Sequence, residues 1–470
     1  MTKTLPRTFR ILGFALAAAT LPALAQAPPK LDAASAAEVD RIVREVLAAT
    51  GVPSASLAIV KDGQIVSLRA WGDAKLSPRT PASSDMRYSI GSVSKQFTAA
   101  AILLLAEEGK LSLDDPVSRF VPDVTRAGEV RIRELLSHTS GYRDYWPQDY
   151  VPPIMRQPAT AASILDRWAR QPLDFEPGTQ YQYSNTGYVI AGLIVQKASG
   201  TPLLDYLSRR VFKPLGMTSV VNIDRDRLAD TDPVGYQRFG LGPLRPAPKE
   251  GQGWLFAAAE LAMTAEDLAR WNQSVIEQRL LKPASYREME MAVRLKNGLG
   301  IGYGLGVAAT SEAGHRALSH GGEVSGFTAS NMIFPDDRTA ITVLVNQDAS
   351  DAASEIAARV APVLLGKTGS AAAAQDRARR IFEGMQQGKL DRSLFTDNAN
   401  SYFTEQAIRD LAESLSPLGK PTEIKQMRQS ERGGMTFRLL KVEFPQKTLE
   451  IWERDLPDGK IEQYQVMAKE

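Results

Sequence analysis

The sequence predicts an α+β protein in which helices flank one antiparallel sheet, a large all-helical subdomain accompanies the sheet, and a small α+β domain follows. Two hairpin patterns, one near each end of the first 366 residues, predict the sheet, because such a chain most simply pairs its hairpins in one sheet. Helical patterns between the hairpins predict the helical part. An alanine- and glycine-rich break near residue 366, followed by new helical and strand patterns, predicts the separate domain.

The first residues have the order of a secretory signal peptide. Three basic residues precede residues 11–21, an apolar segment that is too short to span a bilayer stably. The Ala-Leu-Ala sequence at 23–25 suits signal peptidase, so residues 1–25 are predicted to be removed; Ala-Gln-Ala at 25–27 also fits but puts Pro28 directly after the cut. A buried N-terminal helix or a retained anchor is the alternative. The protein is therefore expected to be exported, to the periplasm or outside the cell, with no stable membrane span in its mature form.

The first domain opens with a helix and a hairpin. Residues 31–49 carry apolar side chains at helical spacing, which predicts a surface helix. Two β-rich runs, residues 56–60 and 65–70, flank an Asp-Gly turn, which predicts a hairpin. Mainly helical patterns then continue to about residue 300, in the segments 97–108, 161–170, 188–197 and 264–278.

Strand patterns return after the helical block. Residues 331–334 and 340–345 predict a second hairpin, and residues 350–365 predict a closing helix. Two helices and three strands are predicted beyond a linker, at residues 376–387, 404–415, 436–443, 448–454 and 460–467. The predicted boundaries are a domain at 31–366, a linker at 367–375 and a small α+β domain at 376–470.

Composition limits the chemistry. The chain of 470 residues has 56 Lys and Arg against 54 Asp and Glu, a net charge of +2, which argues against nucleic-acid binding. It has no cysteine, which excludes disulfides, thiolate zinc sites and cysteine nucleophiles. Its three histidines, His138, His315 and His320, lack a short-spaced ligand pattern, so neither a metal nor a cofactor is expected. Hydrolytic chemistry is left to Ser, Thr, Lys, Tyr or carboxylate groups.

Ser92 and Lys95 form an S-x-x-K sequence after the strand-like residues 86–90 and at the start of the helix predicted at 97–108. Residues three apart on a helix face the same way. This arrangement suits acyl transfer, because a desolvated, neutral Lys95 can take the Ser92 proton while backbone N–H groups stabilise an oxyanion. Alone, the motif is equally compatible with Ser92 as a helix cap and Lys95 as a solvated residue.

Two further segments carry polar groups that suit a catalytic site. In the Y-S-N sequence at 183–185, Tyr183 can act as a base only if a cation such as Lys95 lowers its pKa from about 10, and Asn185 can orient Lys95 and a substrate carbonyl. The glycine-rich residues 318–327, just before a predicted strand, allow close approach to a ligand that His320 could face. A core tyrosine in a turn and a solvated histidine in a glycine-rich turn are the alternatives.

The three motifs, in this order, resemble those of the serine β-lactamase and penicillin-binding-protein superfamily, specifically its class C β-lactamase-related branch. That branch also includes D-alanyl-D-alanine carboxypeptidases, D-aminopeptidases and esterases. Further similar stretches are Glu-Leu-Leu-Ser-His-Thr-Ser-Gly at 134–141, Pro-Leu-Gly-Met at 214–217 and Tyr-Gly-Leu-Gly at 303–306. The likeness spans about residues 34–365 and implies a β-lactamase-like serine hydrolase domain at 31–366.

The resemblance implies Ser92 as nucleophile, Lys95 and Tyr183 as the proton-transfer pair, and Asn185, His320, Gly321 and Gly322 as substrate-binding residues. It also implies that the backbone N–H of Ser92 supplies half of an oxyanion hole and that a residue near Glu323 supplies the other half. No metal and no cofactor are implied. The expected partner is a small-molecule or peptide substrate, with a further partner possible through the C-terminal domain.

One departure bears on the substrate. The superfamily usually has Lys-Thr-Gly as its third motif, whereas this chain has His-Gly-Gly at 320–322. The Lys-Thr-Gly at 367–369 is rejected because it follows the closing helix and no strand holds it. Histidine, with a reference pKa of about 6.5, attracts a carboxylate less than lysine at neutral pH. We therefore expect an esterase or D-amino-acid peptidase, with a β-lactamase or D-alanyl-D-alanine carboxypeptidase as the alternative.

Two rival functions are weaker. Ser319 lies in a loose variant of a nucleophile elbow, but glycines rather than a helix follow it. A catalytically idle binding or regulatory member, acting through the C-terminal domain, is the other alternative, because fold does not fix function. An idle protein would be expected to have lost one of Ser92, Lys95 and Tyr183, and all three are present.

Overall fold

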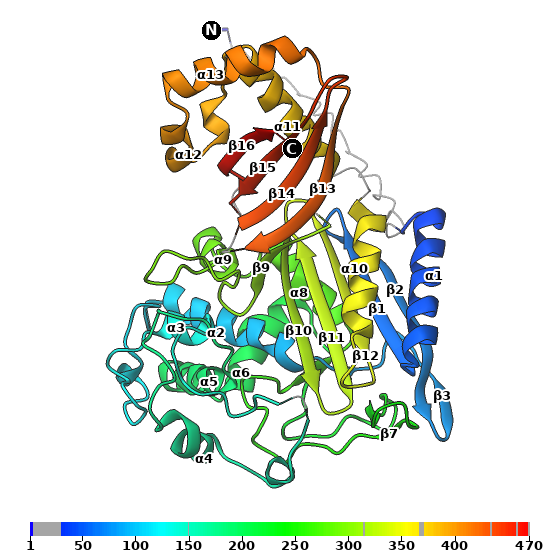
Figure 1. Ribbon diagram of the computed structural model, residues 1–470. Helices are drawn as coiled ribbons and strands as arrows, with labels where there is room; N and C mark the ends of the chain where they lie inside the picture. Colours follow the sequence, from blue (N-terminus) through cyan, green and yellow to red (C-terminus); the bar gives the residue numbers. More distant parts are fainter. Residues whose placement is uncertain are drawn as a thin grey trace.

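The computed structural model describes residues 1–2, 30–148, 150–313, 315–365, 371–432, 435–456 and 459–468. Nearly all of the predicted signal peptide, the Lys-Thr-Gly at 367–369 and the first part of the predicted linker lie outside these residues. The described chain forms a large mixed domain and a smaller C-terminal unit beyond one end of its main sheet (Figure 1).

The predicted hairpins join in one antiparallel sheet of seven strands, which confirms the predicted fold class. Its order is β3-β2-β1-β12-β11-β10-β9. The first hairpin meets the second where β1 pairs with β12, Leu57 opposite Val343. The strands of this sheet are β1 (Ser54–Lys61), β2 (Gln64–Leu76), β3 (Arg79–Pro81), β9 (Ala308–Glu312), β10 (His315–Val324), β11 (Phe327–Phe334) and β12 (Thr339–Val345).

Helices cover both faces of the sheet (Figure 1). The predicted first and closing helices, α1 (Ala33–Thr50) and α10 (Ala352–Leu365), pack on one face, where Val43 and Ile356 are fully buried. Helix α8 (Ala265–Ile276) packs on the other face and joins it to the helical block through Trp271, which is fully buried. Apolar residues on one stripe of each helix thus find a sheet face to bury against.

The helical block lies between the two hairpins, as predicted. The segment predicted as one helix at 161–170 is a single α-turn followed by a π-helical turn at Leu165–Ala169. The other elements of the block are α2 (Lys95–Glu107), α3 (Ile132–Leu136), α4 (Ala161–Ile164), α5 (Asn185–Ser199), α6 (Leu203–Leu207), α7 (Lys213–Leu215), α9 (Pro283–Glu290) and the short strands β4 (Tyr88–Ser89), β5 (Val221–Asn222), β6 (Tyr236–Gln237), β7 (Arg245–Pro246) and β8 (Leu261–Met263).

The glycine-rich third motif is strand rather than turn. Residues 318–324 belong to β10 and pair with β11, with Gly322 opposite Ala329. The expectation of a segment preceding a strand is therefore wrong for most of the motif. The glycines leave β10 without side chains where it meets the segment that carries Ser92, as the site geometry below shows.

The C-terminal unit has its own sheet and its own core. The antiparallel order is β13-β14-β15-β16, and Phe382 and Ile451 are among its fully buried residues. Helix α11 begins at Ala371, inside the segment predicted as linker. The elements are α11 (Ala371–Gln386), α12 (Asp397–Tyr402), α13 (Glu405–Leu415), β13 (Glu423–Arg432), β14 (Met435–Glu443), β15 (Thr448–Asp455) and β16 (Ile461–Ala468).

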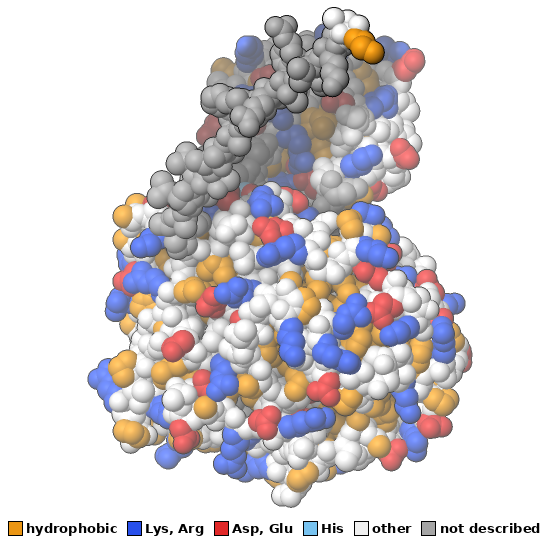
Figure 2. All heavy atoms as spheres, turned by 180° about the vertical axis from the view of Figure 1, so that it is seen from behind, with side chains coloured by type: hydrophobic (Ala, Val, Ile, Leu, Met, Phe, Trp, Pro, Cys, Tyr) orange, Lys and Arg blue, Asp and Glu red, His pale blue; other side chains and the backbone are white. Residues whose placement is uncertain are grey.

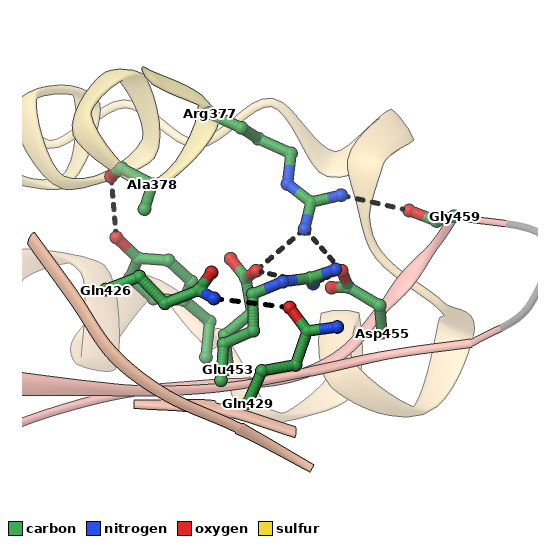
Figure 3. A network of polar contacts seen from close by, with 9 residues as sticks. Arg377, Ala378, Gln426, Gln429, Glu453, Asp455 and Gly459 are labelled. Atoms are coloured by element: carbon green, nitrogen blue, oxygen red, sulfur yellow. Dashed lines mark hydrogen bonds and ion pairs between the residues drawn. The ribbon is translucent and has the colours of Figure 1, made fainter. Parts of the chain in front are cut away.

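A buried ion network ties α11 to this sheet (Figure 3). Nη2 of Arg377, from α11, donates to Glu453 at 2.7 Å and to Asp455 at 2.5 Å, and Arg438 of β14 contacts the same two carboxylates. Glu453 is fully buried. Two cations and two carboxylates thereby neutralise one another beneath the helix.

The surface seen in Figure 2 carries interspersed cationic and acidic side chains, as expected from a net charge of +2. Within the described residues, no helix is both long enough and apolar enough to cross a membrane. The same residues contain no group of three or more His, Cys, Asp or Glu side chains suited to a metal ion.

Candidate active site

Ser92 lies in a 3-10 turn, Gly91–Ser94, between β4 and α2. Gly91 has a φ of 50°, and a Cβ on it would lie 2.5 Å from the backbone nitrogen of Glu323 in β10. A side chain at residue 91 would therefore push β10 away from the turn. The turn presents Ser92 to a cleft of about 980 Å³.

Lys95, the first residue of α2, is fully buried, and its ammonium group has three partners. Nζ lies 3.0 Å from Ser92 Oγ, 2.8 Å from Asn185 Oδ1 and 3.0 Å from the carbonyl oxygen of Ala258. The amide and carbonyl oxygens can only accept hydrogen bonds. In the neutral amine, these two oxygens therefore take both hydrogens, and the lone pair is left for the Ser92 hydroxyl.

Burial lowers the pKa of Lys95 from 10.5 to about 7, although the Asp144 carboxylate opposes the shift. Desolvation disfavours the charged form of an amine, so a large share of Lys95 is neutral near pH 7. The sequence-based expectation of a desolvated base beside Ser92 thus has a matching geometry. A neutral amine aimed at the hydroxyl is what proton abstraction from serine requires.

Tyr183 hydrogen-bonds with Ser92. Its ring centroid is 4.9 Å from Lys95 Nζ. The pKa of Tyr183 is nevertheless raised: burial dominates, and the hydrogen bond with Ser92 only partly offsets it. The expectation that Lys95 lowers this pKa does not describe the resting site. Tyr183 rests as a neutral phenol, which is a proton donor rather than a base.

Asn185 and Asp144 form a polar pair beside Lys95. Asn185 begins α5, and its backbone N–H donates to Asp144 Oδ1 at 3.0 Å while its Nδ2 donates to Oδ2 at 3.3 Å. This pairing turns the amide oxygen of Asn185 toward Lys95. Asp144 also accepts from the backbone N–H of Trp146 at 3.1 Å. Burial raises the pKa of Asp144, and the N–H donors and Lys95 oppose that shift.

Strand β10 touches the Ser92 turn at Gly322. A Cβ there would lie 1.9 Å from the carbonyl oxygen of Ile90 and 3.2 Å from the backbone nitrogen of Ser92. Gly321 has open space instead, because its nearest neighbour, the Ala329 carbonyl, is 3.9 Å away. The contact at Gly322 brings the backbone of residues 322–323 beside the Ser92 N–H, where two N–H groups can face one oxyanion.

His320 is a neutral side chain with both ring nitrogens engaged. Nδ1 lies 2.5 Å from the Gly321 carbonyl oxygen and Nε2 lies 2.8 Å from the hydroxyl of Tyr303. Burial, helped by the nearby Lys95, lowers the pKa of His320 to about 4. The third motif therefore supplies no cation at neutral pH, which is stronger than the partial neutrality expected from a reference pKa of 6.5.

Two further groups of residues line the cleft. One comes from the loop between residues 144 and 156, including Trp146 and Tyr150, and the other from residues 237–239, 248 and 348–354. Described residues of the C-terminal unit do not line it. His315, the third histidine, pairs with Asp337 at 2.9 Å at the start of β10, and Ser319 lies within that strand rather than on a strand–turn–helix.

The structure thus brings Ser92, Lys95, Tyr183, Asn185 and His320 together, although they lie up to 228 positions apart in the sequence. Sequence reasoning missed Asp144, which lies in a stretch without a motif, and gave no role to Tyr303, which it noted only as part of a similar stretch. Asp144 is found only once the fold places its loop beside the start of α5.

Comparisons with known proteins show which chains this one is similar to. The family model described as Beta-lactamase matches residues 39–364. A D-aminopeptidase of Brucella anthropi is 32% identical over 322 residues, covering 68% of this chain and 60% of the relative. Penicillin-binding protein 4* of Bacillus subtilis is 31% identical over 61% of this chain and 66% of that protein. The chain thus spans about three fifths of the D-aminopeptidase that it matches.

Two solved structures are also similar. A D-amino acid amidase from Ochrobactrum anthropi SV3, complexed with D-phenylalanine, has a TM-score of 0.64 and 25% identity and covers 71% of this chain and 99% of its own. The octameric penicillin-binding protein homologue from Pyrococcus abyssi has a TM-score of 0.61 and 23% identity and covers 92% of this chain and 99% of its own. The second likeness concerns the fold alone and reaches into the C-terminal unit.

Proposed function

This chain belongs to the β-lactamase family, within the serine β-lactamase and penicillin-binding-protein superfamily, and from that membership we propose that it is a serine hydrolase that forms an acyl-enzyme on Ser92. We further propose that its substrates are amides and short peptides that begin with a D-amino acid carrying a free amino group. The acylation chemistry is argued from Ser92, Lys95 and Tyr183, and the substrate class from the charge states of Asp144 and His320.

Acylation begins with the neutral form of Lys95. Its lone pair takes the proton of Ser92 while Oγ attacks the substrate carbonyl carbon, and the oxygen that becomes negative lies between the N–H groups of Ser92 and Glu323. Tyr183, a neutral phenol, gives its proton to the leaving nitrogen as the C–N bond breaks. The Lys95 ammonium then returns a proton to Tyr183, so the site is again neutral. Water attacks the ester by the same route in reverse, which restores Ser92.

The observation that carries the substrate class is the pair of groups, Asp144 and His320, that line the same cleft as Ser92. Asp144 lines the cleft as an acceptor of three N–H hydrogen bonds, and His320 lines it as a neutral ring. A carboxylate beside the nucleophile attracts a substrate ammonium group, whereas a neutral imidazole offers nothing to a substrate carboxylate. The names D-aminopeptidase and D-amino acid amidase, borne by relatives, support the same choice and the D configuration.

The alternatives fit this site less well. A β-lactamase or a D-alanyl-D-alanine carboxypeptidase binds a substrate carboxylate, for which the neutral His320 is poorly suited. An esterase would use the same acyl-enzyme but needs no ammonium-binding carboxylate. An idle binding protein does not require a lysine whose pKa is near 7 beside a serine.

The test compares substrates that differ in one group. D-Phenylalanine p-nitroanilide should be hydrolysed at least about tenfold better, by kcat/KM, than its N-acetyl derivative, since acetylation removes the ammonium charge. Its kcat/KM should also exceed that of the L-isomer and that of the anionic nitrocefin. Asp144→Asn should remove the advantage over the acetylated substrate, and Ser92→Ala should remove labelling by a fluorophosphonate. Equal hydrolysis of free and acetylated substrates contradicts the proposed substrate class.

We also propose that the protein is exported and that residues 1–25 are the cleaved leader. The support is that basic, apolar and small residues follow one another there as in a signal peptide. N-terminal sequencing of the protein recovered from the periplasm or medium should begin at residue 26. Recovery of the intact chain from the cytoplasm contradicts it.

A further inference from the structure

Two of the motifs noted in the sequence have no part in the acyl-transfer steps. Ser-His-Thr-Ser-Gly at 137–141 contributes His138, and Tyr-Gly-Leu-Gly at 303–306 contributes Tyr303. Both side chains are buried, His138 fully and Tyr303 at 5% exposure. Neither hydrogen-bonds Ser92 or Lys95 among the described residues, so their contacts with the rest of the site define what they can do.

His138 contacts the segment around Tyr183 in three ways. Its carbonyl oxygen accepts from the backbone N–H of Gln182 at 3.0 Å, and its ring Nδ1 accepts from the backbone N–H of Ser184 at 3.0 Å. Its ring also stacks on the Tyr183 ring, with centroids 4.1 Å apart and planes at 29°. The residues before and after Tyr183 and the face of its ring are thus all contacted by one residue, His138, through its backbone carbonyl and its ring.

The Tyr303 hydroxyl hydrogen-bonds with Tyr188 as well as with the two histidines, and the direction of donation along the histidine contacts follows from the groups at their ends. Because Nδ1 of His138 accepts from an N–H, its Nε2 carries the hydrogen of the neutral ring and faces the Tyr303 hydroxyl at 3.3 Å. Because Nδ1 of His320 faces a carbonyl oxygen, it carries the hydrogen, and Nε2 accepts from the Tyr303 hydroxyl at 2.8 Å. Donation therefore runs from His138 to Tyr303, then to His320 and to the Gly321 carbonyl.

This series of hydrogen bonds links the two parts of the site that must meet at Ser92. At one end is the segment that carries the Tyr183 hydroxyl, and at the other is the strand whose backbone at residues 322–323 lies against the Ser92 turn. Both rings are neutral, since burial lowers the pKa of His138 well below its ordinary value and that of His320 to about 4. His138 also has a φ of 59°, an unfavourable conformation for a non-glycine residue that its contacts maintain.

We propose that His138 and Tyr303 are positioning residues that hold Tyr183 and the third motif in register with Ser92, so that acylation, rather than substrate binding, depends on them. The proposal rests on the proposed acyl-enzyme but not on the substrate class. It gives a role to the two conspicuous motifs that the acyl-transfer steps leave unused.

Tyr303→Phe tests the link, because it removes one hydroxyl and keeps the ring. The rate of Ser92 labelling by a fluorophosphonate should fall about 10- to 100-fold, since a displacement of about 1 Å in a reacting group can cost about 100-fold. In an active assay kcat should fall while KM stays within about threefold. The matched control is Tyr286→Phe, because Tyr286 is also buried and its hydroxyl donates to a backbone carbonyl, that of Ser274, outside the site. It should leave the labelling rate unchanged.

His138→Asn tests the other end. Asparagine tolerates a positive φ and offers an oxygen in place of Nδ1, so the backbone contact survives while the stacking and the donation to Tyr303 are lost. Labelling should again slow by about 10- to 100-fold. The double variant with Tyr303→Phe should be little slower than the slower single variant, because members of one unit are non-additive.

The outcomes separate the two proposals. Slower labelling of Tyr303→Phe with an unchanged Tyr286→Phe supports the positioning role, even if D-amino-acid amides are not hydrolysed. Labelling of Tyr303→Phe at the rate of the unaltered protein overturns it, as does a double variant whose losses multiply. A fall in melting temperature alone, equal in the two tyrosine variants, also overturns it, because the hydroxyl would then be only structural.

Discussion

A methyl group on Gly322 would lie 1.9 Å from the carbonyl oxygen of Ile90, so strand β10 reaches the Ser92 turn only because residue 322 has no side chain. The Ile90 oxygen belongs to the backbone and cannot swing aside as a long side chain can. The two segments are 232 positions apart in the sequence, and their contact sets the spacing between the Ser92 N–H and that of Glu323.

The first prediction compares adjacent glycines. Gly322→Ala should separate β10 from the turn and reduce acylation of Ser92 by about 100-fold or more, the cost of losing one oxyanion donor. Gly321→Ala is the comparison: its Cβ would be 3.9 Å from the nearest atom, so β10 should stay in place and Ser92 should be acylated much faster than in Gly322→Ala. Fluorophosphonate labelling of both variants, with melting temperatures, checks this. A Gly322→Ala variant that labels normally contradicts the close contact.

The second prediction concerns pH. In the proposed acylation the neutral amine of Lys95 is the reactive form, and burial lowers its pKa to about 7. Acylation should therefore be maximal above pH 7 and fall by about tenfold per pH unit well below it, as the ammonium form takes over. Asn185→Asp should move this limb to higher pH, since a carboxylate 2.8 Å from Nζ favours the charged amine. A labelling rate that is flat from pH 5 to 8 contradicts Lys95 as the base.

The third prediction concerns the charge of the third motif. His320→Lys should raise the turnover of anionic nitrocefin relative to D-phenylalanine p-nitroanilide by about tenfold, because a lysine brings a cation where the neutral His320 has none. The ratio is the informative quantity, since the change also disturbs the contact with Tyr303. Ser319→Lys is the control: successive residues of a strand face opposite sides, so it puts the same charge on the other face of β10.

Much of the fold could be predicted because it depends on local periodicity. The helix predicted at 31–49 is α1, and the hairpin at 56–70 is β1 and β2 with its Asp-Gly turn. Strand β13 was missed because Glu423–Arg432 is polar along most of its length and, at the edge of its sheet, shows no alternation. The glycines of β10 were expected just before a strand rather than within one, because the close packing against another backbone that they permit cannot be read from the sequence around them.

In the site too, features that depend on local sequence could be predicted, whereas those that depend on the fold could not. Ser92 and Lys95 are neighbours on one turn, so their spacing alone predicted that they face each other. The neutrality of His320 and the protonation of Tyr183 depend on burial, which only the fold supplies. Asp144 accepts a hydrogen bond from Asn185, 41 positions away, and no pattern in the sequence around Asp144 predicts this contact.

The last prediction concerns the C-terminal unit, whose division from the catalytic domain is itself a proposal. Arg438 is 6% exposed and forms ion pairs with both Glu453 and Asp455. Arg438→Leu should leave those two carboxylates with Arg377 alone and lower the stability of the unit by about 3–5 kcal/mol, the cost of breaking a buried ion pair. Arg454→Leu is the matched control. Arg454 lies on the opposite face of the same sheet, 4.9 Å from the ring of Phe437, and its loss should cost about 1 kcal/mol or less.

Neither arginine variant should change the rate of Ser92 labelling, because the buried core of the C-terminal unit shares no residue with the two cores of the catalytic domain and described residues of the unit do not line the cleft. A chain that ends at residue 369 should label at Ser92 for the same reason. Thermal unfolding followed in parallel with labelling would separate the two effects, because the melting temperature of the unit should fall while the labelling rate of Ser92 stays the same. If Arg438→Leu or the shortened chain loses labelling together with stability, the two units fold as one and the division at residues 367–375 is wrong.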